Sequence, residues 1–251
     1  MKILDLGQDP IISVKTNDQE ISASLYSEDG KSLIDTLALK QSVFFKTMYD
    51  FRWLDVRIIQ FPGDLIALQQ LFMRVKPTLV VETGVAHGGS LVYSASLMKL
   101  NSISNGRVIG IDIDIRAENR KIIESHPFSP MIKLCEASST SSVALDFVKS
   151  NLLEDDVIMV ILDSSHQREH VARELEQYCS LVTEGSYILP MDGALGYVGD
   201  VPGQSAESFT DNPLPAITNF LQKHPEFELD NIFDELGVTS SPMGALKRKL
   251  A

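Results

Sequence analysis

Residues 80–90 read Val-Val-Glu-Thr-Gly-Val-Ala-His-Gly-Gly-Ser and decide the fold of this chain. A short β-branched run leads into a glycine-rich turn, and a helical pattern follows the turn. Such a turn lies at the carboxyl edge of a parallel sheet. There, glycine lets the backbone approach a ligand closely, and the first N–H groups of the helix face that ligand. The stretch therefore predicts a ligand site at the end of a buried strand.

Two residues distinguish this turn from a dinucleotide-binding loop. Ala86 occupies the middle position of a Gly-x-Gly-x-x-Gly spacing that begins at Gly84, and Glu82 places a carboxylate beside the turn. A carboxylate disfavours a pyrophosphate and favours a cofactor that carries positive charge. We therefore predict that S-adenosylmethionine is bound by Glu82, Thr83, Gly84, His87, Gly88, Gly89 and Ser90. For His87, a role at the start of the helix remains an alternative.

The next two predicted strands add polar groups to the same edge of the sheet. Residues 107–113 form an apolar strand that ends in acids at Asp112 and Asp114. We expect Asp112 to accept hydrogen bonds from the ribose hydroxyls. The alternative is that the two acids only cap the following helix. Ser138 and Ser139, which follow a strand at 131–135, are expected near the adenine, as donors and acceptors of hydrogen bonds.

The remaining pattern alternates strands with helices. We predict helices over 63–75, 91–98 and 168–181, and further strands over 78–82, 156–162 and 186–191. This alternation is typical of a doubly wound, mostly parallel α/β sheet. We expect one domain over residues 51–251, preceded by an N-terminal extension over 1–50 that acts as an arm or lid.

Composition excludes several partners. The chain of 251 residues is 44% hydrophobic and carries a formal net charge of −12, which argues against a nucleic-acid or anionic-membrane partner. No apolar run reaches the roughly 20 residues that span a bilayer, so no membrane insertion is expected. Cys135 and Cys179 lack metal-ligand spacing and are expected to be buried, reduced thiols. We predict a cytoplasmic protein.

The ends of the fourth and fifth strands carry Asp163, His166 and Asp192. Asp163 and Asp192 can ligate a hard cation such as Mg²⁺, and the alternative is that Asp163 caps a helix while Asp192 opens a turn. His166 and Asp163 are the predicted catalytic residues, with His166 as general base or substrate contact. His170 is more consistent with the surface or packing of a helix. We expect the acids of all these strand ends to face one crevice.

Five segments together resemble a known family. They are Val81-Glu-Thr-Gly with Gly88-Gly-Ser, Ile109-Gly-Ile-Asp, Ile161-Leu-Asp-Ser-Ser-His, Val171-x-x-Glu-Leu, and Ser241-Pro-Met-Gly-Ala-Leu-Lys-Arg. In order and spacing, they resemble the cephalosporin hydroxylase and rhamnosyl O-methyltransferase family over about residues 50–250. The resemblance implies a class I methyltransferase fold that uses S-adenosylmethionine, often with Mg²⁺, on hydroxyls of sugars, glycolipids or secondary metabolites. It also favours a homo-oligomer.

One position departs from the family pattern. Where the family carries a Glu-Asp pair after the fifth strand, this chain has Met191-Asp192. A thioether is a poor ligand for a hard cation, so we expect weakened metal binding or a third ligand from elsewhere. Two other functions remain open: a nicotinamide-dependent oxidoreductase, and a binding protein with a degenerate site. The segment 195–215 is a predicted active-site lid, and its composition identifies no acceptor.

Overall fold

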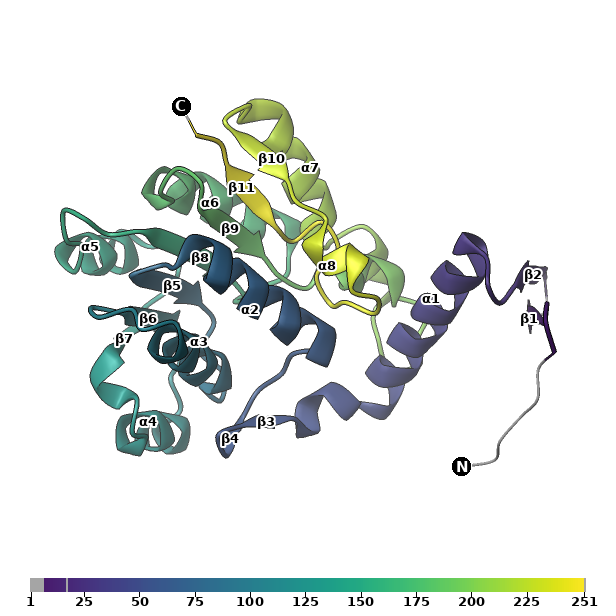
Figure 1. Ribbon diagram of the computed structural model, residues 1–251, viewed down its shortest axis with the longest axis horizontal. Coiled ribbons are helices and arrows are strands. Elements are labelled where there is room, and N and C mark those ends of the chain that lie inside the picture. The colour runs from purple at the N-terminus through teal and green to yellow at the C-terminus, as the bar shows by residue number, and fades with distance from the viewer. Residues whose placement is uncertain (1–6, 17, 251) are drawn as a thin grey trace.

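The computed structural model describes residues 7–16 and 18–250, and its centre is a seven-stranded sheet (Figure 1). The strand order is β10-β11-β9-β8-β5-β6-β7. The parallel strands are β5 (Leu79–Thr83), β6 (Arg107–Asp112), β7 (Ile132–Glu136), β8 (Ile158–Leu162) and β9 (Tyr187–Pro190). At one edge, β11 (Leu246–Arg248) and β10 (Phe227–Leu229) run antiparallel to their neighbours.

Helices cover both faces of the sheet. One face carries α2 (Pro62–Val75), α3 (Gly89–Leu100), α4 (Ala117–Ser125) and the short α8 (Ile232–Glu235). The other face carries α5 (Ser142–Ser150), α6 (Arg168–Tyr178) and α7 (Pro213–Lys223). The predicted doubly wound, mostly parallel sheet is therefore confirmed.

The central strands are apolar on both faces because each face packs against helices. In β8, Met159 and Ile161 belong to the core under α2 and α3, whereas Val160 and Leu162 belong to the core under α6 and α7. Each fully buried aliphatic side chain contributes about 1.5–3 kcal/mol relative to exposure. This two-sided burial explains the continuous apolar run of the sequence, which lacks the alternation of a half-exposed strand.

Several elements differ from their predicted extent. The helix predicted over 168–181 ends at Tyr178 and continues as the 3₁₀ turn η3 (Cys179–Leu181). The lid segment contains η4 (Gly193–Tyr197) and η5 (Ala206–Phe209) and runs into α7. The remaining short elements are η1 (Thr47–Asp50), η2 (Ser129–Met131), β3 (Arg52–Trp53) and β4 (Val56–Arg57).

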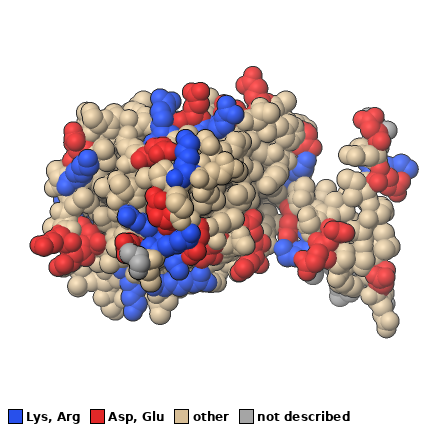
Figure 2. Space-filling view, turned by 90° about the horizontal axis from the view of Figure 1, so that it is seen from above, with Lys and Arg blue, Asp and Glu red and all other residues tan. Residues whose placement is uncertain are grey.

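The N-terminal arm stands off the body (Figures 1 and 2). It consists of a hairpin, β1 (Ile11–Lys15) with β2 (Glu20–Ser24), and the helix α1 (Glu28–Phe45), whose first turn is capped by the Ser27 side chain. The end of α1 nearer the body contacts the sheet domain. Leu39 and Val43 belong to a small apolar cluster with the lid segment, and Lys40 forms an ion pair with Asp200.

Three predictions from composition can be compared with the structure. Acidic and basic side chains are interspersed on the face that Figure 2 shows. Within residues 7–16 and 18–250, no helix combines the length and apolarity needed to cross a bilayer. Cys135 and Cys179 are both buried and free.

The strand order places the ligand site. The chain enters the sheet at the central strand β5, runs outward to β6 and β7, and then returns to β8 and β9 on the other side of β5. The loops after β5 and β8 therefore diverge to opposite faces of the sheet, and this divergence opens a crevice at the carboxyl ends of the strands.

Gly84 controls how closely these loops approach, and we predict that Gly84→Ala is severely destabilising. Its φ is +88°, and a Cβ at this position would collide with the backbone carbonyl of Asp163. Gly203 has the same φ of +88° but open space around it. By chemical denaturation, Gly203→Ala should cost about 1–2 kcal/mol, and Gly84→Ala at least about 3 kcal/mol more. Equal costs would show that the close approach at Gly84 is unimportant.

Candidate functional site

A cavity of about 530 Å³ lies at the carboxyl edge of the sheet. Most of the predicted site residues line it: Gly84, His87, Gly88, Gly89, Ser90, Asp112, Ser138, Ser139, Asp163, His166 and Asp192. Its other side is formed by the arm and the lid segment, through Leu39, Val43, Met48, Leu195 and Val198. The structure therefore brings five strand ends and the arm together around one space.

The glycine-rich turn is held in place by the neighbouring strand. The Asp112 carboxylate accepts hydrogen bonds from the backbone N–H groups of Val85 at 2.8 Å and Ala86 at 3.4 Å. Asn119 donates to the carbonyl of Ala86 at 2.7 Å, which fixes a residue whose φ is +43°. Asp112 does not cap the next helix, because α4 begins at Ala117 after Arg116. The alternative of a purely capping role for Asp112 is thus wrong.

Glu82 does not lie in the wall of the large cavity. Its side chain is fully buried and accepts a hydrogen bond from the hydroxyl of Ser90. It lines a separate small cavity of about 10 Å³, whose wall shares Ser90, Gln60 and Asp163 with the large one. The expectation that all the acids face a single crevice is therefore wrong for Glu82, because β5 is covered on both faces at this position.

Thr83 is also absent from the wall of the large cavity. It is fully buried, and its hydroxyl has no hydrogen-bond partner among the described residues. The next residue, Gly84, is the first of β5 and its turn to reach the cavity. Contacts of Glu82 and Thr83 with the cofactor therefore stay predictions, whereas Gly84 and the residues after it line the cavity directly.

Burial controls the charge of Glu82. Removal of its carboxyl group from water raises its pKa to about 7, against the smaller lowering effect of the Ser90 hydrogen bond. One carboxyl oxygen, Oε2, has no partner among the residues described. A proton on this carboxyl near neutrality lowers the cost of the burial.

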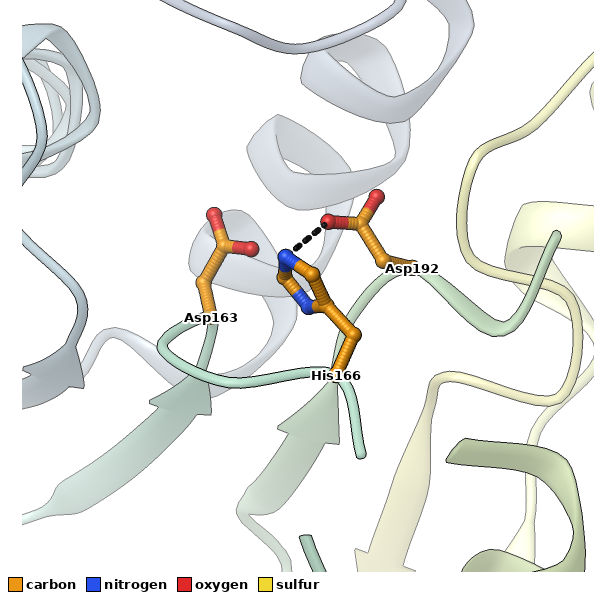
Figure 3. Close-up of side chains that lie close together, drawn as sticks. All are labelled: Asp163, His166 and Asp192. Carbon is orange, nitrogen blue, oxygen red and sulfur yellow. Dashed lines mark ion pairs between the residues drawn. The ribbon is translucent and has the colours of Figure 1, made fainter. Parts of the chain in front are cut away.

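Asp163, His166 and Asp192 form a compact cluster at the ends of β8 and β9 (Figure 3). One ligand atom from each residue lies within 4.8 Å of the other two. His166 Nε2 is 3.2 Å from Asp192 Oδ2, and the imidazole lies between the two carboxylates. These side chains come from adjacent strand ends, which is the convergence that the sequence predicts.

The Asp163 carboxylate lies in an unfavourable electrostatic environment. Its pKa is raised well above the ordinary value, first by burial and then by the negative charges of Asp192 and Glu82. Gln60 partly compensates by donating a hydrogen bond to Asp163 Oδ2 at 3.2 Å. The Gln60 side chain is itself buried, and its Oε1 lacks a partner among the described residues. A cation beside Asp163 would relieve this repulsion.

Asp192 is held in a special backbone conformation. Its φ is +60°, and its N–H donates to the Ser241 hydroxyl at 3.2 Å. That hydroxyl in turn lies 3.8 Å from the sulfur of Met191, which is 1% exposed. The segment around Ser241 therefore fixes the turn so that Asp192 faces the cavity while Met191 points into the core.

Neither aspartate caps a helix with its side chain. Helix α6 begins at Arg168 after Gln167, and the Arg168 N–H donates to the Asp211 carboxylate at 2.8 Å, not to Asp163. The 3₁₀ turn η4 does follow Asp192, but without a hydrogen bond from the Asp192 side chain. The capping alternative is thus wrong for Asp163. Asp192 does open a turn, as the alternative stated, because its carbonyl accepts a hydrogen bond from the Leu195 N–H at 3.1 Å, but its carboxylate takes no part in that turn.

The cluster fits a divalent cation in part. Two carboxylates facing one point are a donor set for Mg²⁺, which fills its remaining positions with water or substrate oxygens. Met191 contributes nothing, since its thioether is buried against Ser241. The third donor within reach is the imidazole of His166.

A second polar network lies beside the same cavity. Ser139, from the loop after β7, contacts His170 of α6 at 2.9 Å, and Ser164 contacts both His170 and Glu174. His170 is therefore part of the cavity wall, whereas the sequence favoured helix surface or packing.

Three polar residues at the site that sequence reasoning missed carry no strong sequence signal. Gln60 and Asn119 are isolated polar residues beside predicted helices, and Ser164 sits inside the Asp-Ser-Ser-His segment. Glu174 alone has a signal, since a carboxylate on the apolar face of an amphipathic helix is unusual.

The raised pKa of Glu82 generates a stability prediction. Because the folded protein holds the Glu82 proton up to about pH 7 and the unfolded chain only to about 4.5, stability contributed by this proton is lost as pH rises through that window. The free energy of unfolding should fall by at most about 1.4 kcal/mol per pH unit in this window. In urea unfolding from pH 5 to 8, Glu82→Gln should lack this component.

An exposed glutamate provides the matched control for this measurement. Glu228→Gln, on β10, should follow the wild-type curve across the same pH range. Parallel curves for wild type and Glu82→Gln would show that Glu82 titrates normally in the folded protein.

Comparison with known proteins gives a consistent result. Residues 45–249 match the family model described as Rhamnosyl O-methyltransferase/CmcI. The rhamnosyl O-methyltransferase of Mycobacterium tuberculosis is 28% identical over 192 residues, which cover 74% of this chain and 73% of that protein.

Solved structures agree on the fold. The apo structure of CmcI superimposes with a TM-score of 0.57 at 19% identity, over 81% of this chain and 78% of that one. The structure of CmcI with Mg and SAM gives 0.56 at 20% identity, over 80% and 78%. The family model, in contrast, matches one continuous segment that contains the sheet, the glycine-rich turn and the carboxylate cluster. The chain therefore belongs to the Rhamnosyl O-methyltransferase/CmcI family.

Proposed function

We propose that the protein is an S-adenosylmethionine-dependent O-methyltransferase that acts on a hydroxyl of a sugar, glycolipid or secondary metabolite. The observation that carries the proposal is the single cavity in which the glycine-rich turn and Asp112 adjoin the cluster of Asp163, His166 and Asp192. Family membership supports the same reaction.

The half of the cavity at β5, β6 and β7 suits the cofactor. Asp112 Oδ2 accepts from the Val85 and Ala86 N–H groups and Oδ1 from the Asp114 N–H, which leaves a lone pair on Oδ1 for a ribose hydroxyl. The first-turn N–H groups of α3 face the turn, and Ser138 and Ser139 close the far end. The acidic cluster lies at the opposite end, where it favours a sulfonium charge.

The other half suits the acceptor. Its walls are mainly apolar and come from α1, η1 and the lid segment, through Leu39, Val43, Met48, Leu195 and Val198. These walls match the hydrophobic part of an acceptor, and the hydroxyl to be methylated would point at His166. We further propose that the arm over residues 1–50 acts as a lid on this half, with the sheet domain over 51–251 as the methyltransferase domain.

In the proposed reaction, the bond between sulfur and the methyl group breaks as the bond from the acceptor oxygen to the methyl group forms. Holding donor and acceptor in line can lower the barrier by on the order of 7–11 kcal/mol. Positioning therefore contributes more than proton removal, for which a base adds about 10²- to 10⁴-fold.

His166 is the proposed general base. Its Nε2 lies 3.2 Å from Asp192 Oδ2, so the carboxylate can orient the ring and stabilise the imidazolium formed when the acceptor proton is taken up. Asp163, on the other side of the ring, adds negative charge beside the transferring methyl group.

Asp163 and Asp192 would hold Mg²⁺, which when bound lowers the pKa of an acceptor hydroxyl. Met191 in place of an acid predicts weak binding. Because of Met191, a second candidate function is a binding protein with a degenerate metal site. The two differ in whether the folded protein transfers a methyl group at all.

We also propose that the protein forms a homo-oligomer in the cytoplasm. The arm exposes large apolar side chains, Ile11, Ile21, Tyr26, Phe44 and Phe45, on a segment that projects from the body. Such a surface is typical of contact with another chain. The two free cysteines support a reducing compartment.

The proposed roles of Asp112 and His166 predict opposite results. Asp112→Asn should weaken binding of S-adenosylmethionine by at least about 100-fold, because it removes charge-assisted hydrogen bonds. His166→Ala should leave cofactor affinity nearly unchanged and lower turnover by about 10²- to 10⁴-fold. Calorimetry and single-turnover assays with hydroxylated acceptors separate the two effects.

Asp114→Asn is the matched control, since it removes a neighbouring acid outside the cavity. A thermal-shift comparison of S-adenosylmethionine, NAD and buffer tests the reaction class, because ligand at 100 times its dissociation constant adds about 2.7 kcal/mol. Stabilisation by NAD alone would overturn the proposal, as would cofactor binding lost in His166→Ala.

The metal proposal predicts a gain on substitution of Met191. Met191→Glu places a carboxylate in the small buried cavity that Met191 shares with Asp163 and should tighten Mg²⁺ binding by at least tenfold, whereas Asp163→Asn should remove it. Met191→Gln, polar but uncharged, is the control. Calorimetric Mg²⁺ titration of folded, cofactor-bound proteins measures the affinities. Equal affinities for wild type and folded Met191→Glu would contradict the assignment of the site.

A further inference from the structure

Four polar side chains form a chain of contacts at the β7 end of the cavity. Ser139 Oγ is 2.9 Å from His170 Nε2, and Ser164 Oγ is 3.2 Å from the same nitrogen. Ser164 donates to Glu174 Oε1 at 2.8 Å, and that oxygen is 3.5 Å from His170 Nε2. The chain therefore connects a carboxylate in α6 to a serine in the cavity wall.

The Glu174 end of this hydrogen-bonded network is buried, which is energetically unfavourable for a carboxylate. Glu174 is fully buried, and its Oε2 has no partner among the described residues. Ser139 is 4% exposed but still lines the large cavity. A buried carboxylate on an otherwise apolar helix face is expensive, and neither methyl transfer nor metal binding, as argued above, requires it.

The hydrogen bond from Ser164 to Glu174 selects one tautomer of His170. Ser164 uses its only hydrogen to donate to Glu174, so it presents lone pairs to His170. Glu174 Oε1 presents lone pairs to the same nitrogen. Two acceptors beside Nε2 require that Nε2 carries the proton, and its shorter contact is with Ser139. Ser139 Oγ therefore accepts from His170, and its own O–H bond remains free.

The backbone of Ser139 is clamped as well. Its carbonyl accepts hydrogen bonds from Gln177 Nε2 at 2.8 Å and from the Tyr178 hydroxyl at 2.6 Å. Both donors lie on α6, the helix that carries His170 and Glu174. The free O–H bond of Ser139 is thus held at a defined place, with the cavity as its remaining direction.

The order of the strand ends says which part of the cofactor lies there. Asp163 and Asp192 mark the reacting end, after β8 and β9, and Asp112 after β6 marks the ribose. A nucleoside extended from the first point through the second places its base at the next strand, β7. Ser139 follows β7 directly.

We propose that the Ser139 hydroxyl donates a hydrogen bond to an unprotonated ring nitrogen of the cofactor's purine, and that His170 and Glu174 are positioning residues that fix this polarity. The proposal rests on the proposed function, because it assigns the base-recognition end of that site. Adenine offers N1, N3 and N7 as acceptors. A base that presents N–H at the recognised position is rejected, because two donors would then face each other.

The test is a double-mutant cycle between Ser139 and the purine nitrogens. Binding of S-adenosylhomocysteine and of its 1-deaza, 3-deaza and 7-deaza analogues is measured by calorimetry on wild type and Ser139→Ala. For wild type, one of the three analogues should bind roughly 5- to 10-fold more weakly than S-adenosylhomocysteine. For Ser139→Ala, that analogue and S-adenosylhomocysteine should bind equally well. If every analogue binds wild type like the parent, or the deficit persists in Ser139→Ala, the proposal is overturned.

The positioning role needs its own variants. His170→Leu removes the donor to Ser139, so the hydroxyl rotates freely and the discrimination against that analogue should fall at least twofold. His170→Gln retains an N–H donor and should restore it. A loss of thermal stability in His170→Leu with unchanged discrimination would overturn the positioning role and leave a structural one.

Ser142→Ala is the matched control, since it removes an exposed hydroxyl just after the same loop and outside the large cavity. Its discrimination among the analogues should equal that of wild type. Failure of the parent compound to bind wild type would contradict the proposed function itself. Binding of the parent without any coupling to Ser139 would contradict only this inference.

Discussion

The close passage of the β5 turn over the end of β8 is the constraint on which the site depends. The Asp163 carbonyl occupies the place where any side chain at position 84 would begin. With glycine there, the glycine-rich turn after β5 and the loop that carries Asp163 lie against each other. A side chain would push apart the two loops that the strand order brings together.

That proximity concentrates negative charge. Asp163 lies near both Asp192 and Glu82, and its pKa is raised by burial and by these neighbours. The protein tolerates this through a hydrogen bond from Gln60 and through protonation of Glu82 near neutrality. The arrangement is costly in the free protein and is relieved by a positive ligand, whether a sulfonium or a divalent cation. Under the proposed function, part of the cofactor affinity would come from repulsion that already exists before binding.

The sheet and most cavity residues were predictable because their signals are local. The buried run ending at Leu162, the glycine turn after Thr83 and the acid at Asp112 each follow from one stretch of sequence. The predictions that were wrong concern residues whose surroundings are set by segments far away in the sequence. Glu82 was expected at the cavity wall, but α3 covers its face of β5 and leaves it in contact with Ser90. The contact between His170 and Ser139 could not be predicted, because the two residues are 31 positions apart in the sequence and no local pattern connects them.

The two halves of the cavity have different structural origins. The half proposed to hold the methyl donor is built from strand ends of the sheet, where a shift of one residue disturbs both cores. The half proposed to hold the acceptor is built from α1 and the lid segment, which meet through a small apolar cluster and the Lys40–Asp200 ion pair. Substitutions in that cluster can reshape the acceptor pocket while the sheet keeps its packing. Related enzymes can therefore diverge in the compounds they modify without altering the machinery that delivers the methyl group.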